Sequence, residues 1–289
     1  MSSPARTAAD PGLFGPDSVT WRVHGDPIQW VGGLRSLLLQ TLHPLAMAGV
    51  SQHSSFRSDP WGRLIRTASY VGVTTFGTTA EAEDAGRTVQ SVHRGLAGVE
   101  PGSGTAYTVE DPHLLAWVHC CLVDSFLTTY RRAGGGLTDA EADRYVAEQR
   151  RAAKLVGLDA DAVPGDVAEL AEFFTAVRPE LRLSKPALEA SWLVVVPPMP
   201  LGVQLLARPA WTGVAGLAFA LLPRWARRLY GLPGLPTTDL SATLGLRALS
   251  VAIRPLPDRF REGPHLRAAR ARLERPESSV RRLHALPDV

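Results

Sequence analysis

The chain has 289 residues, of which 45% are hydrophobic and 20% are charged; this composition is typical of a globular protein and excludes general disorder. Two cysteines are too few for a disulfide framework or a cysteine-based zinc site. The formal net charge is only +3 and acidic residues are interspersed with the arginines along most of the chain, so we expect no nucleic-acid partner.

The length fits one large domain with loosely held ends. We expect a flexible N-terminal arm over residues 1–19, a helical domain over 20–275 and a frayed tail over 276–289. The residues after Met1 lack the apolar stretch of a secretion signal, and the most apolar segment, 213–222, is too short to cross a bilayer. These features predict a cytoplasmic protein without a transmembrane segment.

Helical signals begin with the apolar run over residues 28–50. We expect a break at Pro44, because proline has no amide hydrogen to donate and its ring clashes with the preceding turn. Asp59 followed by Pro60 is typical of a helix N-cap and first helical residue, and predicts a helix through about Val71.

The next helix is predicted over about 79–98. Thr78 and Glu81 have the spacing of a capping box, in which each side chain bonds to the backbone amide of the other residue. Apolar residues then recur at steps of three and four, which places them on one helix face: Ala85, Val89, Val92, Leu96 and Val99.

A central helix is predicted over 112–132. Asp111 and Pro112 repeat the N-cap signal, and the segment is apolar on nearly every side, which is typical of a helix inside the core. Further helices are expected at about 138–156, 166–177, 185–195, 211–222, 239–253 and 264–274. Strand signals are weak, so the sequence predicts an all-α fold in a single large multi-helix domain.

His93 lies on the apolar face that Val89 and Leu96 help to define. A histidine in such a place is more often a residue of the core than a ligand. The alternative is iron ligation, because a neutral imidazole in an apolar slot can bind a haem iron from one side. Spacing alone leaves both interpretations open.

Arg63 and Thr67 are four residues apart and therefore share one helix face, which Tyr70 extends and Arg66 adjoins. The ordinary interpretation is a solvated arginine beside a threonine of the core. The functional interpretation is a guanidinium held over a planar anionic ligand, such as a haem propionate, with a hydroxyl next to it.

His43 and His53 lie on either side of the run that begins at Pro44, near the predicted break. A pocket wall is a reasonable place for residues in such a segment. Both histidines are equally compatible with ordinary cap or loop positions.

Four residues of the central helix fall on one face by steps of three and four: His113, Trp117, Cys120 and Asp124. They form either a buried hydrogen-bond network between helices or a proton relay. Cys120 and Cys121 are adjacent and would point about 100° apart in a helix, so we expect core residues and not a redox pair.

Several short segments together resemble one family. They are QTLHP at 40–44, HSSF at 53–56, DPWGRLIRT at 59–67, VHRGLAG at 92–98, Tyr107 before DP at 111–112, LAWVH at 115–119, LP at 222–223 and YGLP at 230–233. This set is similar to the MpaB-type oxygenases, whose best-known members are the rubber oxygenases called latex clearing proteins. The resemblance covers roughly residues 20–275.

The resemblance implies an all-α fold that binds b-type haem, an iron cofactor, in a pocket between central helices. Carried over by motif, His93 matches the proximal iron ligand, and Arg63 and Thr67 match an arginine–threonine pair near the haem. Arg66 falls close to the haem where rubber oxygenases can place a lysine that caps the iron. Arginine is permanently charged and a poor ligand, so we expect no such capping here.

One departure from the family pattern concerns the catalytic base. Rubber oxygenases use an acidic residue upstream of the arginine–threonine helix, whereas no Asp or Glu occurs between Pro27 and Ser58 here. Cleavage of polyisoprene by the same route is therefore in doubt. We hypothesise that His43 or His53 supplies a catalytic base instead.

The function predicted from the sequence is a haem b-dependent oxidoreductase of the oxygenase type, acting on a small apolar molecule with dioxygen or peroxide. One alternative is a haem-binding sensor or storage protein without turnover, and another is a metal-free helical module for an apolar ligand. The basic stretch 267–275 is expected to be a solvated helix face, with a membrane surface or an acidic partner as the alternative. Roles for His119 and Asp124 are left open.

Overall fold

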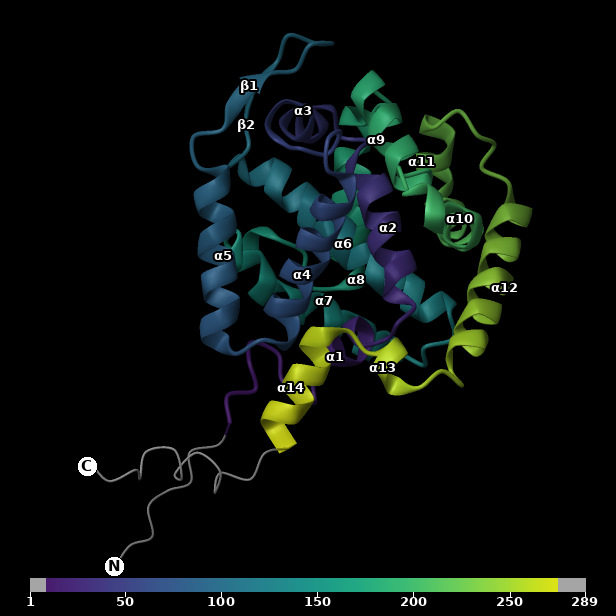
Figure 1. Cartoon of the computed structure of the whole chain (residues 1–289). Coiled ribbons are helices and arrows are strands. Elements are labelled where there is room, and N and C mark those ends of the chain that lie inside the picture. The colour runs from purple at the N-terminus through teal and green to yellow at the C-terminus, as the bar shows by residue number, and fades with distance from the viewer. Residues whose placement is uncertain (1–8, 275–289) are drawn as a thin grey trace, which may run out of the picture.

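The computed structural model describes residues 9–274, where the chain forms fourteen α-helices, two short 3-10 helices and one two-stranded hairpin. The predicted all-α class is thus confirmed as a mostly helical single domain (Figure 1). The predicted frayed tail, 276–289, lies outside the described residues.

The centre of the fold is the pair of helices α2 (Gln29–Gln40) and α6 (Pro112–Arg132), which pack together more extensively than any other two elements described. The Trp117 side chain is fully buried, and its indole N–H donates to the backbone carbonyl of Gln40 across this contact (3.1 Å). Asp111 caps α6 by accepting from the His113 amide, and Gly134, with φ of 93°, follows its end. The expected range of this helix is therefore confirmed.

Two helices form an antiparallel hairpin beside this centre, α4 (Pro60–Phe76) and α5 (Thr79–His93), with only Gly77 and Thr78 between them. The predicted capping box of Thr78 and Glu81 is present. Helix α4 runs five residues past the predicted end at Val71. Only its last residues, 74–76, are fully buried, although the helix is amphipathic. Most of its apolar face is thus only partly covered by protein.

Helix α5 ends at His93 and not at residue 98, so the longer prediction was wrong. Gly95 adopts φ of 73°, a left-handed conformation that ends a helix and that glycine adopts without strain. The chain then forms a short antiparallel hairpin of β1 (Ala97–Val99) and β2 (Ala106–Thr108). The weak strand signals had not predicted it.

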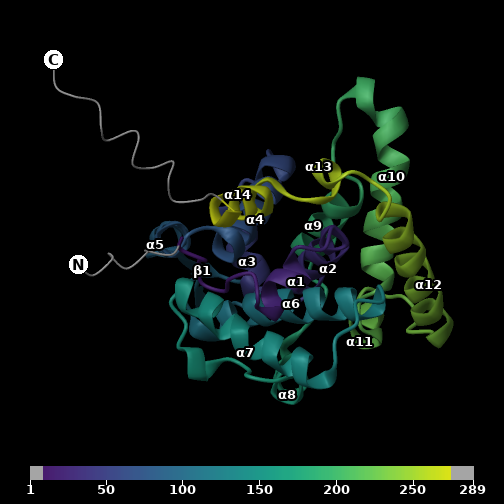
Figure 2. The same ribbon diagram turned by 90° about the horizontal axis from the view of Figure 1, so that it is seen from below.

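A second layer lies along the other side of α6 (Figure 2). It contains, in chain order, α7 (Asp139–Leu155), the 3-10 helix η1 (Ala160–Ala162), α8 (Val167–Val177) and the 3-10 helix η2 (Arg178–Glu180). The short α1 (Val19–His24) joins this layer, because the buried Glu148 carboxylate accepts from the amide and hydroxyl of Thr20 (both 2.8 Å). The sequence had not predicted α1.

The remaining helices flank α2. Helix α3 (Pro44–His53) follows it after the expected break, and α9 (Lys185–Val195) packs on both. Helices α10 (Leu201–Ala220) and α12 (Pro236–Ile253) pack side by side at one edge (Figure 2), joined by α11 (Arg224–Leu229). Helix α10 begins ten residues before its predicted start and passes through Pro209. The edge position permits this proline, because Leu205, whose carbonyl loses its partner, is 86% exposed.

The two ends of the described chain are held near each other. After α13 (Asp258–Arg261), α14 (Pro264–Glu274) packs on α4, and Arg272 donates to the backbone carbonyls of Asp10 and Phe76. The Asp10 carboxylate accepts from the amide and the hydroxyl of Thr79 (2.7 and 3.0 Å). Residues 9–18 of the predicted flexible arm are therefore hydrogen-bonded to the helical domain.

Candidate functional site

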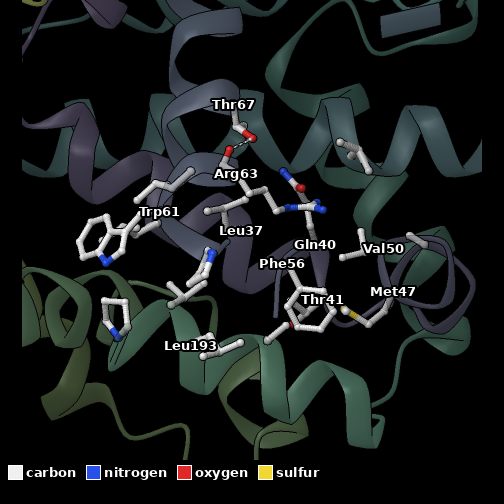
Figure 3. Close-up of a pocket in the computed structure, with 18 of the residues that line it drawn as sticks. Leu37, Gln40, Thr41, Met47, Val50, Phe56, Trp61, Arg63, Thr67 and Leu193 are labelled. Carbon is white, nitrogen blue, oxygen red and sulfur yellow. Dashed lines mark hydrogen bonds between the residues drawn. The ribbon is translucent and has the colours of Figure 1, made fainter. Parts of the chain in front are cut away.

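An apolar pocket of about 110 Å³ lies between α2, α3, α4 and α9 (Figure 3). Its apolar walls include Leu37, Met47, Phe56, Trp61, Leu193 and Trp211. The walls come from segments far apart in the sequence, because α9 contributes Leu193 and α10 contributes Trp211. Such a concave apolar space with a few polar groups is the usual form of a small-molecule site.

Arg63 and Thr67 bring polar groups from α4 to this pocket, one helical turn apart. The Arg63 side chain extends into the cavity (Figure 3), and its Nη1 donates to the hydroxyl of Ser54. Burial, with a smaller contribution from Arg66, lowers the pKa of the Arg63 guanidinium. Among the described residues no carboxylate forms an ion pair with it. Arg63 is thus a poorly solvated cation that lacks a counter-ion.

The Thr67 hydroxyl donates its proton to the backbone carbonyl of Arg63 (3.0 Å). A hydroxyl has one proton and two lone pairs, so the Thr67 oxygen keeps its lone pairs for a donor that enters the pocket. Thr67 therefore presents an acceptor next to the Arg63 donors.

Thr41 is a polar lining residue at the end of α2, and two further hydroxyl groups hold it from behind. Thr41 Oγ1 and Ser191 Oγ each lie 2.8 Å from the Tyr230 hydroxyl. The Tyr230 hydroxyl donates to the Leu38 carbonyl (2.7 Å), which fixes the direction of the group. This cluster joins α2, α9 and the end of α11, so it fixes the position of Thr41 in the pocket wall.

His93 is half-buried at the last residue of α5 and does not line the pocket. Burial lowers the pKa of its imidazole, partly opposed by Glu110, so the ring is neutral near pH 7. Arg63 lies 14 residues before Gly77 and His93 lies 15 residues after Thr78, on the two sides of the α4–α5 turn. At 1.5 Å per residue both are about 21–23 Å from the turn, which puts His93 near the level of Arg63 on the neighbouring helix.

One face of α6 is incompletely covered although the helix is central. Val118 on this face is 40% exposed and lines the pocket, and Leu115, His119 and Leu122 are only half-buried. Burial nevertheless lowers the pKa of His119 to about 4 and raises the pKa of Tyr70 on α4 to about 12. These side chains are therefore largely surrounded by protein, yet part of the surface of each is still accessible to solvent.

The free energy of unfolding of the protein should fall with acidification because of His119. Its pKa of about 4 in the folded chain lies below the ordinary 6.5, so the unfolded chain binds the proton first as the pH falls. The contribution of His119 to the free energy of unfolding is complete above about pH 6.5. It is lost as the pH falls toward 4, at up to about 1.4 kcal/mol per pH unit. Urea unfolding between pH 7 and pH 4.5 measures it. His119→Phe should reduce this slope, and an unchanged slope would contradict the assignment.

The other predicted site residues lie elsewhere. Arg66 is exposed, pairs with Asp59 (3.1 Å) and bonds to Ser55. His53 is exposed at the end of α3, next to the Tyr107 ring. His43 is buried at the start of α3 and outside the pocket lining. The structure therefore brings Arg63 and Thr67 together in the pocket, but not Arg66, His43 or His53.

Asp124 belongs to a buried network, the first of the two interpretations of its helix face. Its carboxylate pairs with the buried Arg35 of α2 (2.8 Å), whose guanidinium also donates to the Ser125 hydroxyl (2.6 Å) and the Leu221 carbonyl (3.0 Å). Burial raises the pKa of the Cys121 thiol, as expected for a core residue. The face thus ties α2 to α6.

Sequence reasoning missed Gln40 and Thr41 as pocket residues, together with the two tryptophans. Trp61 and Trp211 meet edge to face, with ring centroids 4.8 Å apart, and close one end of the pocket. A local signal did exist for Gln40 and Thr41. They lie at the end of α2, just before the break at Pro44, and residues at a helix end can face a pocket. No local signal places Trp211 there, since it lies 150 residues from Trp61.

Comparison with known proteins agrees with the motifs. A family model described as "ER-bound oxygenase mpaB/B'/Rubber oxygenase, catalytic domain" matches residues 21–255, which is most of the chain. No curated protein and no solved structure matches this chain. Within residues 9–274, none of the helices combines the length and the apolar character needed to cross a bilayer. The resemblance inferred from the motifs is confirmed: the chain belongs to the family of mpaB-type and rubber oxygenase catalytic domains.

Proposed function

We propose that this protein is a haem b-dependent oxygenase that acts on a small apolar molecule, with His93 as the proximal iron ligand. Membership of an oxygenase family supports the reaction class. The apolar pocket supports the class of substrate, because its few polar groups leave most of a bound molecule in contact with hydrocarbon.

The observation that carries the proposal is the Arg63 guanidinium, a cation beside an apolar pocket with no carboxylate partner among residues 9–274. A poorly solvated charge is costly unless an opposite charge accompanies it. A haem propionate supplies that charge on an otherwise flat and apolar ligand. Arginine suits the role, because its planar fork of donors matches a carboxylate.

The residues present fit haem in two further ways. His93 is a neutral imidazole, the form that ligates iron, and it is level with Arg63 across the α4–α5 hairpin. The half-covered residues of α4 and α6, among them Tyr70, Val118 and His119, border space beyond the small cavity. A flat cofactor between these helices would complete their burial.

When bound, haem supplies the activation of dioxygen or peroxide. His93 holds the group from one side, and Arg63 binds a carboxylate and fixes its orientation. Thr67 accepts a hydrogen bond next to that carboxylate. The walls formed by Leu37, Phe56 and Leu193 exclude water and admit an apolar substrate.

A base supplied by His43 or His53 stays a prediction, since neither side chain lines the pocket. Arg66 stays a predicted cofactor contact, and in the structure its guanidinium is exposed and pairs with Asp59.

Arg63→Leu should weaken haem binding by about 10- to 100-fold, because a charged hydrogen bond contributes about 1.5–3 kcal/mol. Hemin titration followed at the Soret band measures the affinity. The matched control is Arg87→Leu, an exposed arginine on α5 whose partners are the neighbouring Glu83 and Asp84. Arg66→Leu tests the second predicted arginine in the same series. If folded Arg63→Leu binds hemin as tightly as the natural chain, Arg63 does not bind a propionate.

Turnover separates an oxygenase from a haem-binding sensor or storage protein. The loaded protein should change its spectrum on reduction and again with carbon monoxide, which requires an accessible iron. It should then consume dioxygen or peroxide in the presence of a set of small apolar compounds. A bound haem that can be reduced and that binds carbon monoxide, but never supports oxidation of a compound, would favour the sensor or storage protein.

A metal-free ligand-binding module is the second candidate, favoured by the size of the pocket. About 110 Å³ suits a ligand no larger than benzene, which an apolar cavity of about 150 Å³ can hold. This function predicts a protein that takes up no hemin. Small aromatic compounds would then raise its thermal midpoint, and Leu193→Trp, which fills the cavity, would remove that effect.

A further inference from the structure

Three side chains from separate elements converge outside the pocket. His43 precedes α3 as its N-cap, His113 lies in the first turn of α6, and Glu180 ends η2. Glu180 Oε2 lies 3.3 Å from His43 Nε2 and 3.0 Å from His113 Nε2. One ligand atom from each of the three residues can be chosen so that all lie within 4.8 Å of one another.

Ordinary hydrogen bonding does not account for His43. Its side chain is 1% exposed, and within the described part of the chain neither ring nitrogen has a hydrogen-bond partner. The Glu180 oxygen is near Nε2 but lies outside hydrogen-bonding direction. A buried imidazole with two unsatisfied nitrogens is rare in folded proteins. One ring nitrogen of the neutral imidazole therefore carries a lone pair that no donor of the described chain uses.

The distances fit a tetrahedral metal ion. Nitrogen and oxygen ligands at about 2.0–2.1 Å from a tetrahedral ion lie about 3.3 Å from each other. The two distances from Glu180, 3.0 and 3.3 Å, agree with such an edge length. The remaining pair of ligand atoms, from His43 and His113, lies within 4.8 Å, so a shift of one imidazole toward the other completes the tetrahedral set.

The surrounding charges also favour a cation. No arginine or lysine of the described chain forms an ion pair with Glu180, whose contacts are the two histidines. Asp111 adds a second carboxylate nearby and fixes the start of α6 by accepting from the His113 amide (2.9 Å). Burial keeps His43 neutral, so it need not lose a proton to act as a ligand.

We propose that His43, His113 and Glu180 form a second site, separate from the pocket, that binds one divalent transition-metal ion of the zinc class. Two imidazoles and one carboxylate suit zinc, whereas calcium and magnesium prefer ligand sets made of oxygen alone. His113 and Glu180 are about half exposed, so water reaches the fourth position. Thiolates take no part in this set, and the scarcity of cysteine therefore does not exclude it.

The ion would connect the start of α3, the start of α6 and η2. Residues close to His43 in the chain, Thr41 before it and Met47 after it, line the pocket. The site therefore fixes the α2–α3 junction from outside the pocket. Its occupancy should raise the thermal midpoint of the protein, because a ligand that binds only the folded chain stabilises it by mass action.

The test is zinc titration of the full chain, tag-free and without haem, by calorimetry. We expect one equivalent to bind, and His113→Ala and Glu180→Gln to weaken that binding by about 100-fold or more. Both positions are exposed enough for the variants to fold, which circular dichroism checks. Matched controls are His53→Ala on the end of α3 and Glu172→Gln on α8, both exposed and outside the cluster. They should bind zinc like the natural chain.

Cobalt(II) gives a second readout of the same site. Four-coordinate cobalt should produce visible absorption bands with the natural chain and lose them with His113→Ala. The proposal is overturned if no equivalent of zinc binds, or if His113→Ala binds it unchanged. Since haem is absent throughout, the result is independent of the proposed oxygenase function.

Discussion

Replacing His93 with alanine should abolish stoichiometric haem binding while leaving the protein folded. The side chain is half-buried at the end of α5, so its removal costs little packing. Loss of groups that merely orient a metal ligand weakens binding about 10- to 100-fold, and loss of the ligand itself should exceed that. Hemin titration and the Soret spectrum measure the effect. Adding imidazole to His93→Gly should restore the band, because the free ligand can enter the vacated space.

Two histidine variants make this experiment decisive. His119→Ala tests the rival ligand, since that imidazole is also neutral and borders the uncovered face of α6. His265→Ala is the matched control, because its ring contacts Ser69 on the outer contact of α4 with α14 and does not line the pocket. If His93→Ala retains the spectrum and His119→Ala loses it, the proximal ligand is on α6.

Arg35→Ala should destabilise the fold by about 3–5 kcal/mol, because it leaves the partners of a buried cation unpaired. The side chain is 3% exposed and bonds to Asp124, Ser125 and the Leu221 carbonyl. The change also leaves a cavity between α2 and α6. Urea unfolding followed by circular dichroism measures the free energy of unfolding, which for proteins of ordinary stability is about 5–15 kcal/mol.

The double variant Arg35→Met with Asp124→Leu separates charge from packing. Replacing both members of a buried ion pair with apolar groups of similar volume is often neutral. We therefore expect it to recover much of the stability that Arg35→Ala loses. An Arg35→Ala chain as stable as the natural one would mean that the ion pair does not hold α2 to α6.

The helices were largely predictable because their ends carry local chemistry. Asp59, Thr78 and Asp111 each bond to an amide within three residues, so their effect can be read from neighbouring positions. The end of α5 was missed because Gly95 and the β1–β2 hairpin interrupt an apolar repeat that itself continues to Val99. The start of α10 was missed because Pro209 normally ends a helix, whereas here solvent reaches the freed carbonyl.

The site was predictable only where its residues share one element. Arg63 and Thr67 are one turn apart, so their spacing alone puts them on one face. Leu193 and Trp211 reach the same pocket only through the packing of α9 and α10. The cluster of His43 with Glu180 joins residues 137 positions apart, and no local pattern relates them. Long-range packing places both the pocket walls and this cluster, and no short motif of a single sequence encodes such packing.

The elements that shape the pocket are not the elements that carry the candidate iron ligand. The walls belong to α2, α3, α4, α9 and α10, while His93 belongs to α5 and is followed by a turn in which Gly95 bonds to Glu110. Substitutions at Met47, Leu193 or Trp211 therefore alter the shape offered to a substrate without touching the ligand's support. Pocket shape could therefore be changed separately from the proposed cofactor attachment, and these three wall positions are the place to begin redesign.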